Sequence, residues 1–259
     1  MESDTVFIGI DPTAGKRPMN YAVVDIDLQL LASESGGLDE VLAAALRYPS
    51  AVVAVDAPQS LNGGLMASDA YRATLQPPPS AGHWGGFKVC EYQLKRRGIG
   101  LYSTPTDPAA APAWMKMGFK LFEALRAAGF EGYRPGSAAP LQLMEVHPHA
   151  SYAVLLGRLP LDKKLLEGRL QRQMLLYRRR MPVRDPMDTL EELTPHRLLD
   201  GQVEWPGLHT HDELDALIAS YTAYVAGHSP EQVTAVGDAG EGQIIVPVAP
   251  GELKALYTR

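Results

Sequence analysis

The amino-acid sequence predicts an α/β fold in which a mixed sheet, an antiparallel meander plus parallel strands, is flanked by helices and carries a helical, loop-rich insertion. Three closely spaced β-type runs occupy residues 5–35. A nearly all-apolar run at 51–58 is typical of a strand covered on both faces, as parallel strands are. Residues 60–140 lack sheet periodicity and are too many for a connection, which indicates an insertion. The length of 259 residues fits a single domain over 1–259.

The first predicted strand ends on a carboxylate. Residues 5–11, TVFIGID, are β-prone up to Asp11, and Pro12 prevents a central strand from continuing. Two further runs, 21–27 and 28–35, are separated by an acidic turn. Because short turns join neighbouring antiparallel strands, these three runs predict a meander.

A second strand ends in the same way. Leucine and valine recur at helical spacing over residues 38–46, and Pro49 closes this helix. Residues 51–58, AVVAVDAP, then form a strand that ends on Asp56. Because the helix is a crossover, this strand should lie parallel to a meander strand. If its neighbour is the first strand, Asp56 emerges beside Asp11 at one edge of the sheet.

A third acid follows the insertion. Residues 60–140 contain one convincing helix, 113–128, and otherwise read as a cap rich in loops. Residues 141–148, LQLMEVHP, restore a strand that ends on Glu145, with His147 behind it.

A strongly basic segment comes next. Between Lys163 and Arg184 the chain holds eight Lys or Arg residues against one acid, Glu167, although its formal net charge is −6. The apolar residues of this segment space as one face of an amphipathic helix: Leu165, Leu166, Leu170, Met174 and Tyr177. The basic side of such a helix is most often simply exposed to solvent. The functional interpretation is that its Lys and Arg side chains contact a phosphate backbone. The basic residues expected to make such contacts, here and in an earlier cluster, are Lys95, Arg96, Arg97, Arg172, Arg178 and Arg179.

The last predicted helix, HDELDALIASYTAYVAG, carries two acids in its first turn and ends at Gly227. Asp212 and Asp215 stand at i and i+3 and therefore share one face. That face continues through small side chains that would let the helix pack closely against a sheet, Ala219, Thr222 and Ala223. A short final strand is expected at 242–248, GQIIVPV.

Composition narrows the class of protein. An apolar fraction of 46% supports a full core. The negative net charge argues against a generally basic nucleic-acid coat but allows a local basic face. Cys90 is the single cysteine, best interpreted as a buried core thiol, and fits a reducing compartment. With no signal-peptide pattern and no apolar run near roughly 18 residues, we expect a cytoplasmic protein without a membrane partner; a homodimer is compatible with the sequence.

Three strand-end acids and two acids on a closely packed helix predict a cluster of hard oxygen ligands. Such a cluster suits Mg²⁺ or Mn²⁺ and is a poor Zn²⁺ site, because cysteine ligands and HExxH-type spacing are lacking. Without cations, five carboxylates would repel one another in a partly buried site. The five acids are Asp11, Asp56, Glu145, Asp212 and Asp215.

The order of these features resembles a known superfamily. The meander, the crossover helix, the GID and AVDAP strand ends and the late HDELDAL helix look like the ribonuclease H-like superfamily. The last helix resembles the final acid-bearing helix of RuvC-type Holliday junction resolvases. Within that superfamily, GIDPTAGKR, AVDAP, CEYQL, MEVHP, HDELDAL and GEGQIIVP are similar to the DUF429 proteins, an uncharacterised family of predicted nucleases. These motifs are scattered over nearly the whole chain.

The resemblance implies a metal-dependent nuclease that hydrolyses phosphodiester bonds with two Mg²⁺ or Mn²⁺ ions. Asp11 would bridge the two ions, and Asp56 and Asp215 would complete their shells. Glu145 or Asp212 would be a further ligand or would orient the attacking water.

Three more side chains belong to the implied site. Lys16 would reach a phosphate, and His147 and His211 would be candidate proton carriers. The expected partner is DNA or RNA.

Other interpretations stay open. An Asp near Pro at a strand end often only bonds to the backbone amides of a turn. Asp212, within a Thr210–Glu213 capping box, favours the helix dipole without any metal. An actin-like or sugar-kinase-like phosphotransferase shares the meander and the strand-end Asp; PTAGK and GDAGEG would then be its glycine-rich phosphate loops. A non-catalytic nucleic-acid-binding module is the third alternative.

Overall fold

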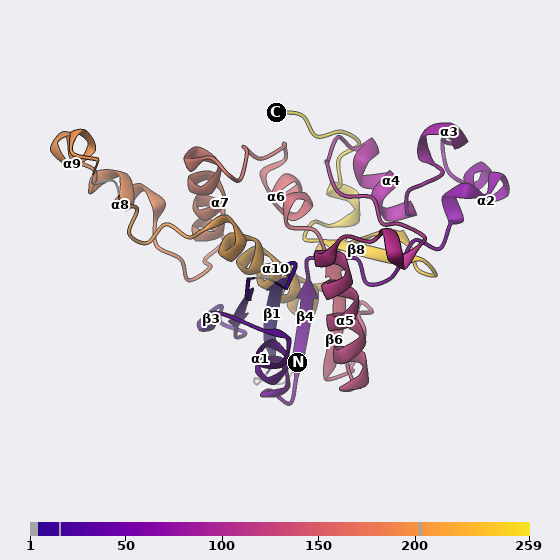
Figure 1. Ribbon diagram of the computed structural model, residues 1–259, viewed down its shortest axis with the longest axis horizontal. Helices are drawn as coiled ribbons and strands as arrows, with labels where there is room; N and C mark the ends of the chain where they lie inside the picture. Colours follow the sequence, from indigo (N-terminus) through magenta and orange to yellow (C-terminus); the bar gives the residue numbers. More distant parts are fainter. Residues whose placement is uncertain (1–4, 16, 202–203) are drawn as a thin grey trace.

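One sheet of eight strands organises the protein (Figure 1). The structure, a computed structural model, describes residues 5–15, 17–201 and 204–259; Lys16, the expected phosphate contact, lies outside the described residues. The strand order is β3-β2-β1-β4-β6-β8-β7, with the short β5 beside β6. The strands are β1 Val6–Asp11, β2 Met19–Val24, β3 Leu30–Gly36, β4 Ala51–Val55, β5 Glu131–Gly132, β6 Leu141–Val146, β7 Thr234–Asp238 and β8 Gly242–Val246.

The described residues also form ten α-helices. The α-helices are α1 Leu38–Leu46, α2 Asp69–Thr74, α3 Ala81–Trp84, α4 Val89–Arg96, α5 Ala113–Ala127, α6 Pro148–Leu156, α7 Leu166–Arg178, α8 Pro186–Glu191, α9 Pro195–Leu199 and α10 His211–His228. Single 3₁₀ turns occupy Leu65–Ala67, Pro108–Ala110, Pro230–Gln232 and Pro250–Glu252. Among the described residues, no helix has the length and apolarity that crossing a membrane requires.

The pairing of the strands confirms the predicted mixed α/β fold. Strands β1, β2 and β3 form an antiparallel meander, and β4, β6 and β8 continue from β1 in parallel. Strand β7, which the sequence did not reveal, closes the far edge antiparallel to β8. The α1 crossover between β3 and β4 accounts for the parallel orientation of β4 relative to β1. This arrangement of strands is consistent with the ribonuclease H-like fold.

Alternation along the strands divides the core between two helical layers. Phe7, Val52 and Met144 pack on the side of α6, α7 and α10. Ile8 and Val53 pack on the opposite side, against α1 and α5. The central strands β1 and β4 are therefore buried on both faces, as expected for parallel strands.

The stretch 60–140 divides into two structural parts. Helices α2 to α4 surround a small cluster of their own, built on Met66, Val89 and Tyr92 (Figure 1), and α4 also packs on β7 and β8 through Cys90 and Leu94. Helix α5 packs on the sheet through Leu121 and other side chains of the second layer. The end of this stretch is thus part of the main core.

The basic segment differs from the sequence prediction. Its helix, α7, begins at Leu166 and ends at Arg178, so Lys163 lies in the preceding loop. The predicted apolar face was wrong, because Leu165 and Tyr177 are 50% and 45% exposed while Arg172 is 1% exposed. The Arg172 guanidinium can be buried because it donates hydrogen bonds to the carbonyl oxygens of Leu161 and Gly168. The polar linker that follows contains α8 and α9, which extend away from the sheet (Figure 1).

Gly227 does not end the last helix, as the sequence suggested. Helix α10 continues to His228. A Cβ atom at Gly227 would lie 2.7 Å from the Phe7 ring and 3.1 Å from a methyl group of Val52. The glycine is therefore required by close packing of the helix on the sheet.

Candidate functional site

Helix α10 crosses strand β1 in direct backbone contact at Gly9. A Cβ atom there would lie 2.1 Å from the carbonyl oxygen of Ala216 and 2.2 Å from the amide nitrogen of Ser220. Residues i and i+2 of a strand share a face, so Asp11 lies on the same side as Gly9. The acid-bearing start of α10, which includes Asp215, is thereby held over the end of the strand.

Asp56 emerges beside Asp11, as the sequence predicted. Ile10 and Val55 are partners in the parallel register of β1 and β4. The backbone N–H of Asp56 donates a hydrogen bond of 2.9 Å to the carbonyl oxygen of Ile10. The two strands therefore end together with one carboxylate each.

The acids of these segments share one electrostatic site. Burial raises the pKa of Asp11 well above its usual value, and the carboxylates of Asp56, Asp215 and Asp212 raise it further. Lys163 opposes this effect. Four of the five predicted acids are thus close enough to influence one another.

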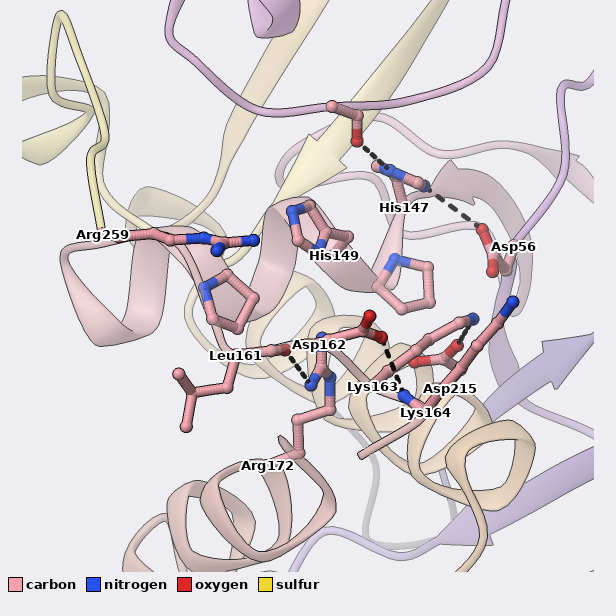
Figure 2. A pocket seen from close by; sticks show the side chains of 13 residues that line it. Asp56, His147, His149, Leu161, Asp162, Lys163, Lys164, Arg172, Asp215 and Arg259 are labelled. Carbon is pink, nitrogen blue, oxygen red and sulfur yellow. Dashed lines mark hydrogen bonds and ion pairs between the residues drawn. The ribbon is translucent and has the colours of Figure 1, made fainter. Parts of the chain in front are cut away.

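Asp215 is paired with a lysine. Its side chain is 2% exposed, and the Lys163 Nζ atom lies 2.5 Å from its Oδ2 atom (Figure 2). Burial raises the pKa of Asp215, although Lys163 lowers it. Burial lowers the pKa of Lys163, but the Asp215 carboxylate more than reverses this, so the lysine pKa is raised. The ammonium is firmly charged and partly neutralises the site.

Asp212 lies at the rim of the site and has its own partners. Arg17 Nη1 is 3.4 Å from Asp212 Oδ2, and His211 Nδ1 is 2.6 Å from Asp212 Oδ1. The predicted capping box is present, because Thr210 Oγ1 accepts a hydrogen bond from the Glu213 N–H and the Glu213 carboxylate accepts one from the Thr210 N–H. Asp212 is therefore an acid in the first turn of a capped helix, where it favours the helix dipole, as well as a neighbour of Asp11.

The structure does not bring Glu145 to the other acids. In β6, Met144 belongs to the α10 side of the sheet and Leu143 to the α5 side. By alternation Glu145 belongs with Leu143, opposite to the face of Asp11. Its carboxylate accepts hydrogen bonds from the Gln59 N–H, at 2.9 Å, and the Tyr102 hydroxyl, at 3.2 Å.

Glu145 instead joins a second buried polar cluster. Burial raises its pKa to about 7, against the opposing charge of the buried Lys88. Glu91 is also buried and accepts hydrogen bonds from the Lys88 N–H and from Thr104 N–H and Oγ1. Cys90 is buried in the same region, and burial followed by Glu145 raises the pKa of its thiol. This cluster ties α4 to the sheet.

Two histidines stand near Asp56. His147 Nε2 lies 3.2 Å from the carbonyl oxygen of Gly100. A carbonyl only accepts, so Nε2 carries the hydrogen and Nδ1, 3.6 Å from Asp56 Oδ1, is free to take a proton (Figure 2). Burial and His147 lower the pKa of His149 to about 4, so this second ring is neutral near pH 7.

Two hollows flank the carboxylates. The first has a volume of about 380 Å³ and is lined by Asp56, Asp215, both histidines and basic side chains, namely Lys163, Lys164, Arg172 and Arg259 (Figure 2). The second has a volume of about 470 Å³, and its lining includes Asp212, Arg17, Lys164 and Arg169. Each hollow therefore combines carboxylates with several basic side chains, and Lys164 lines both.

The other basic residues expected to contact phosphates lie elsewhere. Arg96 and Arg97 line a hollow that shares no residue with the two beside the acids. Lys95 donates a hydrogen bond of 2.6 Å to the carbonyl oxygen of Leu101. Arg178 and Arg179 are exposed at the C-terminal end of α7. Of the six, only Arg172 lines a hollow beside the acids.

Asp11 and Asp56 could supply only part of the ligands of a metal ion. Across residues 5–15, 17–201 and 204–259, no three His, Cys, Asp or Glu side chains are grouped so that they could hold a metal ion. Mg²⁺, however, is usually bound by one or two carboxylates together with water and substrate phosphates. The adjacent Asp11 and Asp56, with excess negative charge around them, fit that manner of binding.

Sequence reasoning missed several residues of this site. Lys163 was placed on a helix face, and its role depends on Asp215, 52 residues further along the chain. Arg17 lies in the GIDPTAGKR motif but was not expected in the site, and Lys164 and His149 belong to none of the motifs quoted above. For the two lysines, the available signal was the density of positive charge after Lys163 in an acidic chain.

Comparison with known proteins places the chain in a family. The model of the family described as "Protein of unknown function (DUF429)" matches residues 9–240. The chain belongs to the DUF429 family. The matched region includes Asp11, Asp56 and Asp215, which confirms the family resemblance seen in the sequence. Searches of curated proteins and of solved structures each returned no match.

Proposed function

We propose that this DUF429 protein is a metal-dependent nuclease that hydrolyses phosphodiester bonds with Mg²⁺ or Mn²⁺. The observation that carries the proposal is the pair Asp11 and Asp56, delivered side by side by adjacent parallel strands and covered by Asp215 of α10. Ligands and catalytic groups of open α/β sheets lie at the carboxyl ends of such strands.

The carboxylates would bind the metal ion, and one histidine would take up a proton. A bound divalent cation would lower the pKa of a water molecule and stabilise charge on the leaving oxygen. Asp11 and Asp56 are the side chains that would hold it. His147 Nδ1 lies beside Asp56 and can accept the proton that the attacking water loses.

The two basic hollows support a polyanionic substrate. Arg17 and Arg169 line one of these hollows, Lys163 and Arg259 line the other, and Lys164 lines both. A phosphate backbone crossing the acids would meet positive charge on each side. Binding by such contacts releases counterions, so the affinity for DNA or RNA should fall steeply as salt rises.

The glycine-rich turn at 237–242 gives less support to a phosphotransferase. It is the hairpin between β7 and β8, and the Gly240 N–H donates to the Asp238 carboxylate. The Glu241 carboxylate accepts hydrogen bonds from the backbone N–H groups of Leu65 and Val89. The turn is thus engaged within the fold, away from the carboxylates of β1 and β4.

The test is hydrolysis of a substrate panel by the purified protein. Single-stranded, duplex and branched DNA and RNA are incubated with Mn²⁺, Mg²⁺ or EDTA. We expect cleavage with Mn²⁺ or Mg²⁺, its loss in EDTA, and its loss in Asp11→Asn. Asp39→Asn, which removes an exposed acid from α1, is the matched control and should cleave like the wild type.

An intact panel, or equal cleavage by Asp11→Asn and the wild type, would contradict the proposal. Stabilisation by ATP–Mg²⁺ with no effect of oligonucleotides would favour the phosphotransferase instead.

A further inference from the structure

The ammonium of Lys163 stands where the acids are most deeply buried. Its Nζ atom is 2.5 Å from Oδ2 of Asp215, a side chain that is 2% exposed. The lysine side chain itself is 41% exposed and enters from the loop that precedes α7 (Figure 2). It also interacts electrostatically with Asp56 and Asp11. One ammonium group therefore interacts with three carboxylates.

Counting charges limits how many metal ions can join it. Asp11, Asp56 and Asp215 carry three negative charges when ionised, and Lys163 carries one positive charge. The remaining two negative charges match one divalent cation. Two divalent ions together with the lysine would place five positive charges against three, and like charges only about 3.5–4 Å apart repel strongly where water is scarce.

The lysine also occupies one of the two oxygens through which Asp215 could bind a second ion. A metal ion on Asp215 requires a free carboxylate oxygen at about 2.0–2.1 Å. The Asp215 Oδ2 atom already accepts a hydrogen bond from Lys163. An ion bound to Oδ2 would have to displace the ammonium from its partner, and an ion bound to the other oxygen of the same carboxylate would be repelled by the ammonium charge.

We propose that Lys163 takes the place of a second metal ion, so that the site holds a single divalent cation on Asp11 and Asp56. This inference rests on the metal-dependent nuclease proposed above. Lys163 keeps its proton throughout and acts as a fixed positive charge for the phosphate that enters the first hollow. Its flexible stem lets the ammonium reach a phosphate oxygen while it remains beside Asp215.

The test is the number of Mn²⁺ ions bound, measured by electron paramagnetic resonance and by calorimetric titration. Three proteins are compared: the wild type, Lys163→Met and the control Lys164→Met. Methionine retains a long unbranched side chain without the charge. We expect one ion in the wild type, two in Lys163→Met and one in Lys164→Met, which removes a neighbouring lysine of the same hollow.

Thermal unfolding gives a second readout. In EDTA, Lys163→Met should unfold at a lower temperature than the wild type, because the buried Asp215 carboxylate loses its lysine partner. Mn²⁺ should restore most of that loss by occupying the vacated position. The double variant Lys163→Met, Asp215→Asn removes the buried charge and should return to one ion.

The outcomes separate the two proposals. Two ions in the wild type, or one ion in a folded Lys163→Met, would overturn the role of Lys163 and leave metal dependence intact. If neither protein binds Mn²⁺, the metal site itself is refuted, and the nuclease proposal and this inference fall together. The wild-type stoichiometry decides even if Lys163→Met fails to fold.

Discussion

Replacing Glu145 by Gln should remove a large part of the pH dependence of stability. The Glu145 side chain is 1% exposed, and the positive charge of the buried Lys88 opposes the rise of its pKa. Burial raises the pKa of Glu91 as well, but this acid shares the Lys88 charge and accepts three hydrogen bonds, which favour its charged form. One lysine balances only one carboxylate, so Glu145 is the acid that keeps its proton.

The magnitude follows from the pKa. Burial raises the pKa of Glu145 from 4.5 to about 7. Between these values the folded protein holds a proton that the unfolded chain has released, so the free energy of unfolding falls as pH rises. Linkage gives a loss of about 2.5 kcal/mol between pH 5 and pH 8. Glutamine cannot titrate, so the variant lacks this pH-dependent contribution to the free energy of unfolding.

Urea unfolding of both proteins between pH 5 and pH 8 measures the effect. The wild-type free energy minus that of Glu145→Gln should decrease by about 2.5 kcal/mol over this range. Glu131→Gln, an exposed acid on the neighbouring β5, controls for the change in net charge. A difference that stays constant with pH would refute the reasoning, because the carboxyl group would then be ionised in both states.

Three further substitutions or measurements test the packing around the acids. Gly9→Ala should lower the free energy of unfolding in urea by about 1–3 kcal/mol, because its Cβ would meet the Ala216 carbonyl at 2.1 Å. The control Gly132→Ala, with open space around the new Cβ, should leave the free energy of unfolding nearly unchanged. Equal effects of the two substitutions would contradict the close crossing of α10 and β1. Thr210→Ala should lower the free energy of unfolding by about 1 kcal/mol through loss of the N-cap of α10, and an unchanged value would show that the cap is replaceable. His149 has its pKa lowered to about 4 by burial and His147, so its NMR signals should not titrate above pH 5; a midpoint near pH 6.5 would refute its burial.

The strand ends could be predicted because their signal is local. An apolar run that stops at Asp11 or Asp56 beside a proline marks both a buried strand and its exit. The intervening helix 38–46 makes the connection a crossover, which fixes the two strands as parallel. The sequence therefore predicts parallel strands that each end on an acid, whereas the pairing of β1 with β4 that makes the two acids adjacent comes from the structure.

The face of Glu145 could not be predicted in this way. Its strand also ends on an acid, but both faces of a central strand are buried, so apolarity does not tell them apart. A shift of one residue moves a side chain to the opposite face. Only the packing of Met144 against the α10 layer shows that Glu145 points away from Asp11.

The basic segment shows a different limit. Sequence periodicity assumes that apolar residues face inward, yet Arg172 is buried because the backbone carbonyls of Leu161 and Gly168 accept its hydrogen bonds. The partner of Lys163 is equally invisible, since Asp215 belongs to another helix. Long-range pairing of charged groups leaves no periodic trace in the sequence.

The contact of Gly9 with α10 also determines when the acids can meet. Roughly two hundred residues separate Gly9 from Ser220, so this contact is among the most distant along the chain. Closing so long a loop is slow, and folding is delayed when such contacts dominate. During synthesis, Asp11 and Asp56 leave the ribosome long before Asp215. A nascent chain therefore carries an incomplete set of carboxylates, and the protein acquires its charge-dense centre only after α10 has docked.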